Sequence, residues 1–370
     1  MNTTDTADDT VAQVRSALQT VIDPDLGRDL VSLGMIKDIV VEDAHVSFTV
    51  VLTTPACPMK ELLESQCREA ALSVPGISDV QIKMTAKVVS KRPMGGALLP
   101  DVKHVIAVAS GKGGVGKSTV CANLAIALAQ AGAAVGVMDA DVYGPTIPML
   151  MGVEDEVLEQ TTYEGPDGNP IKKLLPVHRH GVSIVSMGFL IEPGQPVVWR
   201  GPMLGKVVNQ FLADVAWGPL DYLLVDLPPG TGDVTMSLCE AIPLTGAVIV
   251  TTPQDIAASI AVKSLRAFQR FNVPILGIVE NMAYFIAPDT GKHYQIFGHG
   301  GGQAAAEELK VPFLGELPLD MPMRRAGDDG EPILMTHPDC DQAVFIKEIA
   351  GKLARQISIE SRKFRPLNVV

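Results

Sequence analysis

Nine consecutive residues have the types and spacing that phosphate chemistry requires: Gly111-Lys112-Gly113-Gly114-Val115-Gly116-Lys117-Ser118-Thr119. They satisfy the pattern G-x-x-x-x-G-K-[S/T], follow the apolar run VIAVAS and open the helical segment STVCANLAIALAQ. Glycines let consecutive backbone N–H groups converge on phosphate oxygens, and a helix N-terminus adds the positive end of its dipole. We expect Lys117 to reach the β- and γ-phosphates and Ser118 to bind Mg²⁺. A glycine-rich turn that matches by chance is the alternative, and the strand-to-helix context disfavours it.

Three aspartates stand where phosphoryl transfer needs carboxylates. Asp139 and Asp141 follow the apolar run AVGVM, and Asp226 follows the run YLLV. An aspartate at the carboxyl end of a strand can hold Mg²⁺ or its waters, or can orient the water that attacks the γ-phosphate. Turn-forming aspartates beside Gly and Pro are the alternative. The order of the three residues after the phosphate loop favours the first interpretation.

The elements that must position these residues form a regular pattern from residue 104 onward. Short β-branched runs alternate with longer helical stretches, which indicates a parallel sheet covered by helices on both faces. In such sheets ligands bind beyond the carboxyl ends of the strands, where the glycines and aspartates lie. The runs are VIAVAS, AVGVMDA, VSIVSMG, YLLVDLP, AVIVTT and ILGIVEN.

The first quarter of the chain has a different hydrophobic pattern, with alternating strand segments between helical ones, which predicts a small α+β domain. A segment with two Pro and two adjacent Gly follows it and is typical of a linker. The predicted domains are 1–91 (α+β), 92–103 (linker) and 104–370 (doubly wound, mainly parallel α/β). Within the first domain we expect a helix over 9–20, strands over 36–41 and 45–52, a helix after Pro58 and a strand over 80–88.

Composition limits the classes of partner. The 370 residues are 47% hydrophobic, enough for a large core, and carry a net charge of −12, which disfavours nucleic acid and anionic membranes as partners. The chain starts with the acidic stretch MNTTDTADDT, and its apolar runs are shorter than the roughly 20 residues that span a bilayer. Five widely spaced Cys without a CxxC pair suit a reducing compartment. We expect a cytoplasmic protein.

The phosphate loop resembles a known variant. Its form, KGGxGK[S/T], is similar to the deviant Walker A loop of the Min and Par partition ATPases and of nitrogenase reductase. The resemblance implies that ATP binds between the subunits of a homodimer and that Lys112 acts on the opposing subunit's nucleotide, as an arginine finger does. A solvated loop lysine is the alternative.

The same resemblance assigns roles to the residues at the strand ends. It implies that Asp141 positions the attacking water, that Asp139 belongs to the Mg²⁺ shell and that Asp226 is the Walker B carboxylate. Asn281, in Glu280-Asn281-Met282 at the predicted end of the strand ILGIV, is implied to read adenine, since a carboxamide pairs with both a donor and an acceptor. A structural cap is the alternative for Asn281.

Longer motifs narrow the resemblance. SGKGGVGKST, MDADVYGPT, VVWRGPM, YLLVDLPPGTGD and VENMAYF resemble the Mrp/ApbC family of iron-sulfur cluster carrier ATPases. In the first domain, DPDLGRDLVSLGMI and LTTPACPMKE resemble the iron-sulfur assembly domain fused to many of these proteins. Together they imply a P-loop ATPase whose slow hydrolysis is coupled to delivery of a cluster, of the 4Fe-4S type, to apo iron-sulfur proteins, with cluster assembly factors as further partners.

One departure from the family concerns the cluster ligands. Many members carry C-P-x-C shortly after the ENM segment, where this chain has IAPDT at 286–290, as in the subgroup that contains the chloroplast carrier. Cys57, in TPACP before a predicted helix, is the best remaining thiol. Cys67, Cys121 and Cys239 are expected to be buried small hydrophobes, and Cys239 and Cys340 become candidates only if the fold or a dimer brings them together.

Two other features are weaker, and two other functions stay open. The segment GHGGG at 298–302 lacks the Lys and Ser/Thr of a phosphate loop and predicts a tight turn before a helix, and the seven His show no metal-ligand spacing. A positioning ATPase of the partition or Min class would need a basic amphipathic C-terminal helix or a basic face. Here Glu360 and Pro366 interrupt the positive charges of the tail, and the chain is acidic overall. A nucleotide-switched adaptor without a cluster is the other alternative, because the CxxC is missing.

Overall fold

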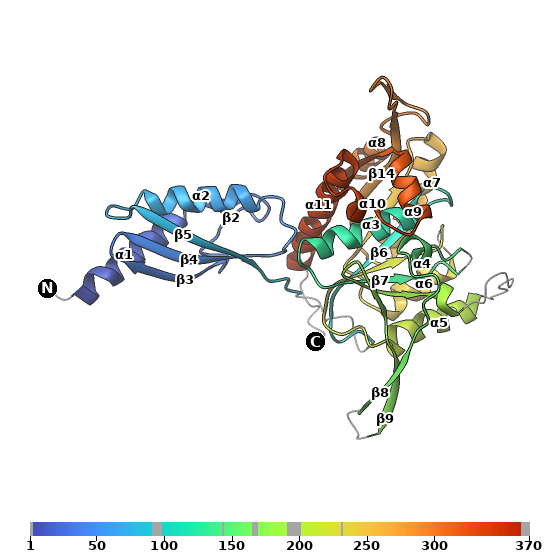
Figure 1. Ribbon diagram of the computed structural model, residues 1–370, viewed down its shortest axis with the longest axis horizontal. Coiled ribbons are helices and arrows are strands. Elements are labelled where there is room, and N and C mark those ends of the chain that lie inside the picture. The colour runs from blue at the N-terminus through green and yellow to red at the C-terminus, as the bar shows by residue number, and fades with distance from the viewer. Residues whose placement is uncertain are drawn as a thin grey trace. The chain divides into compact units, whose positions relative to one another are not determined.

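The computed structural model (Figure 1) describes residues 3–90, 98–142, 144–164, 169–190, 201–230 and 232–363. The chain divides into two units, Met1–Val89 and Ser90–Val370. The Trp and Arg of the WRGPM motif, residues 199 and 200, and the final tail, 364–370, lie outside the described residues.

The N-terminal unit is a three-stranded sheet with two helices packed on it. Its strands pair in the order β3-β4-β5, antiparallel and then parallel. Buried residues alternate along β4, so Val46, Phe48, Val50 and Leu52 face the core on one side of the pleat. The elements are α1 (Thr3–Leu18), β1 (Ile22–Asp23), β2 (Arg28–Asp29), β3 (Ile36–Glu42), β4 (His45–Leu52), α2 (Lys60–Leu72) and β5 (Asp79–Ala86).

The second unit is built on a sheet in which the described residues form nine strands. The order is β10-β11-β7-β12-β6-β13-β14-β15, and β16 also pairs with β14. The pairs from β11 to β14 and the pair β14-β16 are parallel, whereas β10 and β15 are antiparallel additions. The strands are β6 (Val102–Ser110), β7 (Val135–Asp139), β10 (Val177–Arg179), β11 (Val182–Ser186), β12 (Leu220–Asp226), β13 (Gly246–Thr251), β14 (Ile275–Ile286), β15 (His293–Tyr294) and β16 (Phe313–Leu319).

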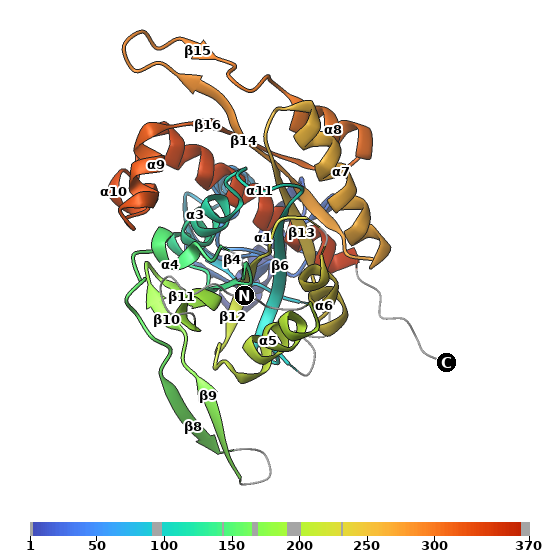
Figure 2. The same cartoon turned by 90° about the vertical axis from the view of Figure 1, so that its right-hand side faces the viewer.

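Helices cover both faces of this sheet, which confirms the predicted doubly wound α/β class (Figure 2). One face carries α5 (Gly201–Asp214), α6 (Asp233–Ala241), α7 (Asp255–Arg270) and α8 (Gly301–Leu309). The other carries α3 (Lys117–Gln130), α4 (Ile147–Leu150), α9 (Met321–Asp328), α10 (Ile333–Thr336) and α11 (Asp341–Lys363). A separate hairpin, β8 (Gln160–Glu164) with β9 (Pro170–Leu174), and a short 3-10 helix (Met187–Leu190) complete the unit.

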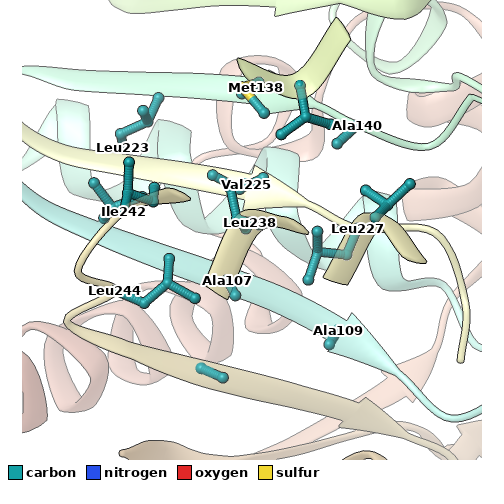
Figure 3. Close-up of a cluster of buried hydrophobic side chains, with 14 of the residues drawn as sticks. Ala107, Ala109, Met138, Ala140, Leu223, Val225, Leu227, Leu238, Ile242 and Leu244 are labelled. Atoms are coloured by element: carbon teal, nitrogen blue, oxygen red, sulfur yellow. The ribbon is translucent and has the colours of Figure 1, made fainter. Parts of the chain in front are cut away.

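The core between the sheet and α6 fixes the strands that carry the site. Ala107 and Ala109 of β6 and Val225 of β12 are fully buried, and Leu238 of α6 packs over them (Figure 3). The small side chains of Ala107 and Ala109 on β6 let α6 pack close to the sheet. Each fully buried Leu adds roughly 1.5–3 kcal/mol to the free energy of unfolding. The carboxyl ends of these strands are therefore held in a fixed relative position.

Two predicted boundaries differ from the structure by four residues or more. Helix α1 starts at Thr3 and not at residue 9, because its first residues are polar and add no apolar period to the sequence. Strand β14 does not end at Met282 but continues to Ile286. Its pairing with β16 is irregular between Asn281 and Phe285, and Met282 has a positive φ of 58°. The predicted end of the strand at Met282 therefore coincides with an irregularity inside β14 and not with its end.

Within the described residues, none of the helices combines the length and the apolar character needed to cross a bilayer.

Candidate functional site

The phosphate loop joins β6 to α3, as its sequence predicts. Gly114 and Gly116 have positive φ values of 76° and 78°, a region that side chains with a Cβ rarely adopt. Gly116 is the N-cap residue of α3, which begins at Lys117. The loop thus turns sharply and presents the N-terminus of α3 to the adjoining cavity, an arrangement suited to an anion.

Gly116→Ala is expected to cost more stability than Gly114→Ala. Both substitutions place a Cβ at positive φ, a strain of about 1–3 kcal/mol. At Gly116 the new Cβ would also collide with Nδ2 of Asn281, whereas the space around Gly114 is open. We therefore expect a lower thermal unfolding midpoint for Gly116→Ala, measured without nucleotide. Equal decreases of the unfolding midpoint in the two variants would show that the contact with Asn281 adds no cost at position 116.

Lys117, Ser118 and Asp226 form one contact network at the start of α3. The ammonium of Lys117 lies 2.7 Å from Oδ1 of Asp226, and the hydroxyl of Ser118 donates to Oδ2 of the same carboxylate at 2.5 Å. Asp141 lies further away, with its Oδ2 3.7 Å from the Lys117 Nζ. Lys117 is 6% exposed and Asp226 is 0% exposed, so this is a buried ion pair. The structure thus brings together four of the residues singled out in the sequence: Lys117, Ser118, Asp141 and Asp226.

Asp139 lies beside this network and is held by the protein itself. Its carboxylate accepts the backbone N–H groups of Asp141 (3.1 Å) and Ile147 (3.2 Å) and the hydroxyl of Ser186 (3.0 Å). Asp139 and Asp226 are register partners on β7 and β12, and both are fully buried. Burial and the charge of Asp226 raise the pKa of Asp139 to about 7, and burial also raises the pKa of Asp226. Two desolvated carboxylates next to a hydroxyl form an all-oxygen donor set that fits Mg²⁺.

A cavity of about 410 Å³ adjoins the loop. The predicted loop residues Lys112 to Thr119 line it, together with Asp141 and Asn281. Its far wall comes from β16 and α9, where Pro318, Leu319 and Met323 provide apolar surface. In the sequence, the segment LPLD at 317–320 indicates the end of a short strand. It does not predict that α9 lines the cavity, because long-range packing brings this helix to the loop.

Asn281 and Lys112 each contact another segment of the same chain. Nδ2 of Asn281 donates to the carbonyl oxygen of Val115 at 2.9 Å, which ties β14 to the phosphate loop. The ammonium of Lys112 donates to Oε1 of Gln254, the N-cap residue of α7, at 2.7 Å. Sequence reasoning did not identify Gln254, which lies 142 residues away in the chain. The adenine contact of Asn281 and the action of Lys112 across a dimer stay predictions.

The five cysteines all lie among the described residues, and none of them forms a disulfide. Burial raises the pKa of Cys67 to about 12 and that of Cys239 to about 11, and it also raises the pKa of Cys121, so these thiols resist forming the thiolate that binds iron. Cys57 is half-buried against the N-terminal core, three residues before α2 and not at its start. Cys340 is half-buried beside the N-terminus of α11. In the described part of the chain, none of the triads of potential metal ligands includes a cysteine.

Comparison with known proteins identifies the family. A family model described as NUBPL iron-transfer P-loop NTPase matches residues 101–354. The chain belongs to this family. A second model, described as iron-sulfur cluster assembly protein, matches residues 11–84 of this NUBPL-family NTPase. Both resemblances inferred from the motifs are thereby confirmed.

Similar proteins extend over both units of the NUBPL-family chain. The iron-sulfur cluster carrier protein of Synechocystis sp. is 47% identical over 357 residues, covering 95% of this chain and 98% of the relative. The protein of the same name from Deinococcus radiodurans is 49% identical over 345 residues, covering 93% and 95%. Among solved structures, a nucleotide-binding protein of Archaeoglobus fulgidus in complex with ADP and with cobalt is 38% identical, with a TM-score of 0.55 and coverage of 65% of this chain and 91% of that chain.

Proposed function

We propose that this chain is an ATP-hydrolysing iron-sulfur cluster carrier that works as a homodimer and delivers clusters to apo iron-sulfur proteins, together with cluster assembly factors. The observation that carries the proposal is the pairing of a complete phosphate-loop site with an iron-sulfur assembly domain in one chain. Relatives at 47% and 49% identity, named iron-sulfur cluster carrier proteins, support it.

In this proposal the site residues divide the work of phosphoryl transfer. Gly111 to Gly116 and Thr119 cradle the phosphates with Lys117, and Asp141 orients the attacking water. Ser118 and Asp226 would hold Mg²⁺, with Asp139 in its shell. When bound, the ion offsets charge on the phosphate oxygens. Lys117 then exchanges the carboxylate of Asp226 for the β- and γ-phosphates, which keeps its buried charge paired.

The cluster is the cargo of this carrier, and Cys57 is the proposed thiol that binds it. Reconstituting the purified chain anaerobically with iron and sulfide is expected to give a stoichiometric cluster, seen as iron per dimer and in the visible spectrum, with and without Mg-ATP. Cys57→Ala is expected to lose most of this iron. Cys239→Ala is the matched control, because Cys239 is also half-buried and its pKa is raised to about 11. Equal iron in the two variants would remove Cys57 as a ligand.

A nucleotide-switched adaptor is the second candidate function. It is favoured by the absence of a CxxC in the sequence and, among the described residues, of a metal-ligand triad that includes a cysteine. A wild-type chain that hydrolyses ATP but takes up no cluster in the same reconstitution would support the adaptor and refute the carrier. The positioning-ATPase alternative gains nothing from α11, because this C-terminal helix buries one face against α3, β14 and β16.

A further inference from the structure

Two glutamates stand directly opposite each other on neighbouring parallel strands, away from the phosphate loop. Glu280 of β14 and Glu316 of β16 are register partners, so their side chains project from the same face of the sheet. Glu280 is fully buried and Glu316 is half-buried. Like charges at such positions destabilise a sheet, and a buried carboxylate without a counter-charge costs several kcal/mol. This arrangement requires something that offsets the negative charge.

Neutral backbone groups provide part of the compensation. The N–H of Gly300 donates to Oε1 of Glu280 at 3.2 Å, and the N–H of Gly302 donates to Oε2. These glycines form the turn that starts α8, as the segment GHGGG predicts. Among the described residues, neither Glu280 nor Glu316 forms a salt bridge with a Lys or Arg. The two carboxylates therefore face each other without a Lys or Arg side chain paired to either.

The same turn supplies a third metal-binding group. His299, whose side chain is exposed, lies over the two glutamates, and one ligand atom from each of Glu280, His299 and Glu316 lies within 4.8 Å of the others. Around an ion with bonds of 2.0–2.2 Å, ligand atoms are at most about 4.4 Å apart. Binding therefore requires the ligand atoms to move closer together, through rotation of the exposed His299 and of the half-buried Glu316. Spacing along the sequence could not predict this group of three ligands, because the residues come from two strands and a loop.

We propose that Glu280, His299 and Glu316 bind a divalent transition-metal cation such as Zn²⁺, Fe²⁺ or Co²⁺. The imidazole selects this class over Mg²⁺ and Ca²⁺, which prefer oxygen ligands throughout. Each oxygen of Glu280 keeps a lone pair after accepting its backbone N–H, so the bonds to Gly300 and Gly302 orient the ligand without consuming it. Three protein ligands leave further positions for water, and exposed His299 gives the ion a route from solvent.

The fold connects this site to the nucleotide cavity by two short routes. Asn281 directly follows Glu280, projects from the opposite face of β14 and holds the carbonyl of Val115 in the phosphate loop. The turn that carries His299 packs against Pro253, and the next residue, Gln254, holds Lys112. An ion that links the turn to β14 and β16 therefore also restricts the motion of Asn281 and Gln254, the two residues that hydrogen-bond to the phosphate loop.

The test is a cobalt titration of the full-length chain after treatment with a chelator, without nucleotide or Mg²⁺. In the wild type we expect Co²⁺ to bind with visible d–d bands and without the near-ultraviolet charge-transfer band of a cobalt-thiolate bond. His299→Ala and Glu316→Gln are each expected to weaken this binding at least about tenfold. His293→Ala and Glu308→Gln are the matched controls, because both residues are exposed and lie on neighbouring elements; they are expected to bind as the wild type does.

Thermal unfolding separates loss of a ligand from loss of structure. Without metal, Glu316→Gln is expected to unfold at the same or a higher temperature than the wild type, because it removes one of two opposed charges. Added Co²⁺ is expected to raise the midpoint of the wild type more than that of Glu316→Gln at the same cobalt concentration. Equal cobalt affinity in the wild type and both ligand variants, or a thiolate band in the bound state, would overturn the proposal. So would a metal-free Glu316→Gln that is less stable than the metal-free wild type.

Discussion

Lys117→Met is expected to reduce ATP hydrolysis on the order of 100- to 1,000-fold and to destabilise the ATP-binding unit by about 3–5 kcal/mol. The loss of rate follows from losing the charge that meets the phosphates. The loss of stability has a separate cause in the structure, where the Lys117 ammonium lies 2.7 Å from the fully buried carboxylate of Asp226. Without Lys117 this carboxylate loses its cation in a desolvated position. Phosphate release and the thermal unfolding midpoint measure the two effects.

The double variant Lys117→Met/Asp226→Asn separates the two effects. Replacing both charges leaves no uncompensated ion, so most of the lost stability is expected to return. Hydrolysis is expected to stay low, since both residues belong to the proposed catalytic machinery. A Lys117→Met variant as stable as the wild type would contradict the buried ion pair. If the double variant were no more stable than Lys117→Met, the lost stability would not come from the unpaired charge of Asp226.

Local sequence patterns were sufficient for much of the fold. The six β-branched runs correspond to β6, β7, β11, β12, β13 and β14, because a strand covered on both faces must be apolar along its whole length. The phosphate loop was equally predictable, because Gly114 and Gly116 adopt positive φ values that favour glycine. In these strands and in this loop, the local residues themselves determine the backbone conformation, so the sequence of the segment is enough to predict it.

What the sequence could not provide is the pairing of distant segments. The contact of Lys112 with Gln254 depends on how the loops after β6 and β13 meet. The cavity wall from α9 depends on packing, and the opposition of Glu280 and Glu316 depends on the register of two parallel strands. A shift of one residue in that register would move Glu316 to the other face of the sheet. No spacing within one segment encodes that choice.

Lys112→Ala is expected to reduce ATP hydrolysis on the order of 1,000-fold if Lys112 acts on the partner's nucleotide as an arginine finger does. In the structure its ammonium is held by Gln254 of the same chain, so the lysine must leave this partner to act across a dimer. Gln254→Ala is therefore expected to preserve hydrolysis or raise it. Lys172→Ala, which changes an exposed lysine of β9, controls for the loss of positive charge. The initial rate of phosphate release is the measurement.

Mixing two inactive variants distinguishes action across the dimer from action within one chain. When Lys112→Ala is mixed with Asp141→Asn, a mixed dimer contains one site with its own Asp141 and with Lys112 from the other subunit. Random pairing makes half of the dimers mixed and restores one of their two sites, so the mixture is expected to regain about a quarter of the wild-type rate. If Lys112 acts within its own chain, both sites stay defective and the mixture remains inactive. That result would remove the case for a shared nucleotide and leave Lys112 as a loop residue bonded to Gln254.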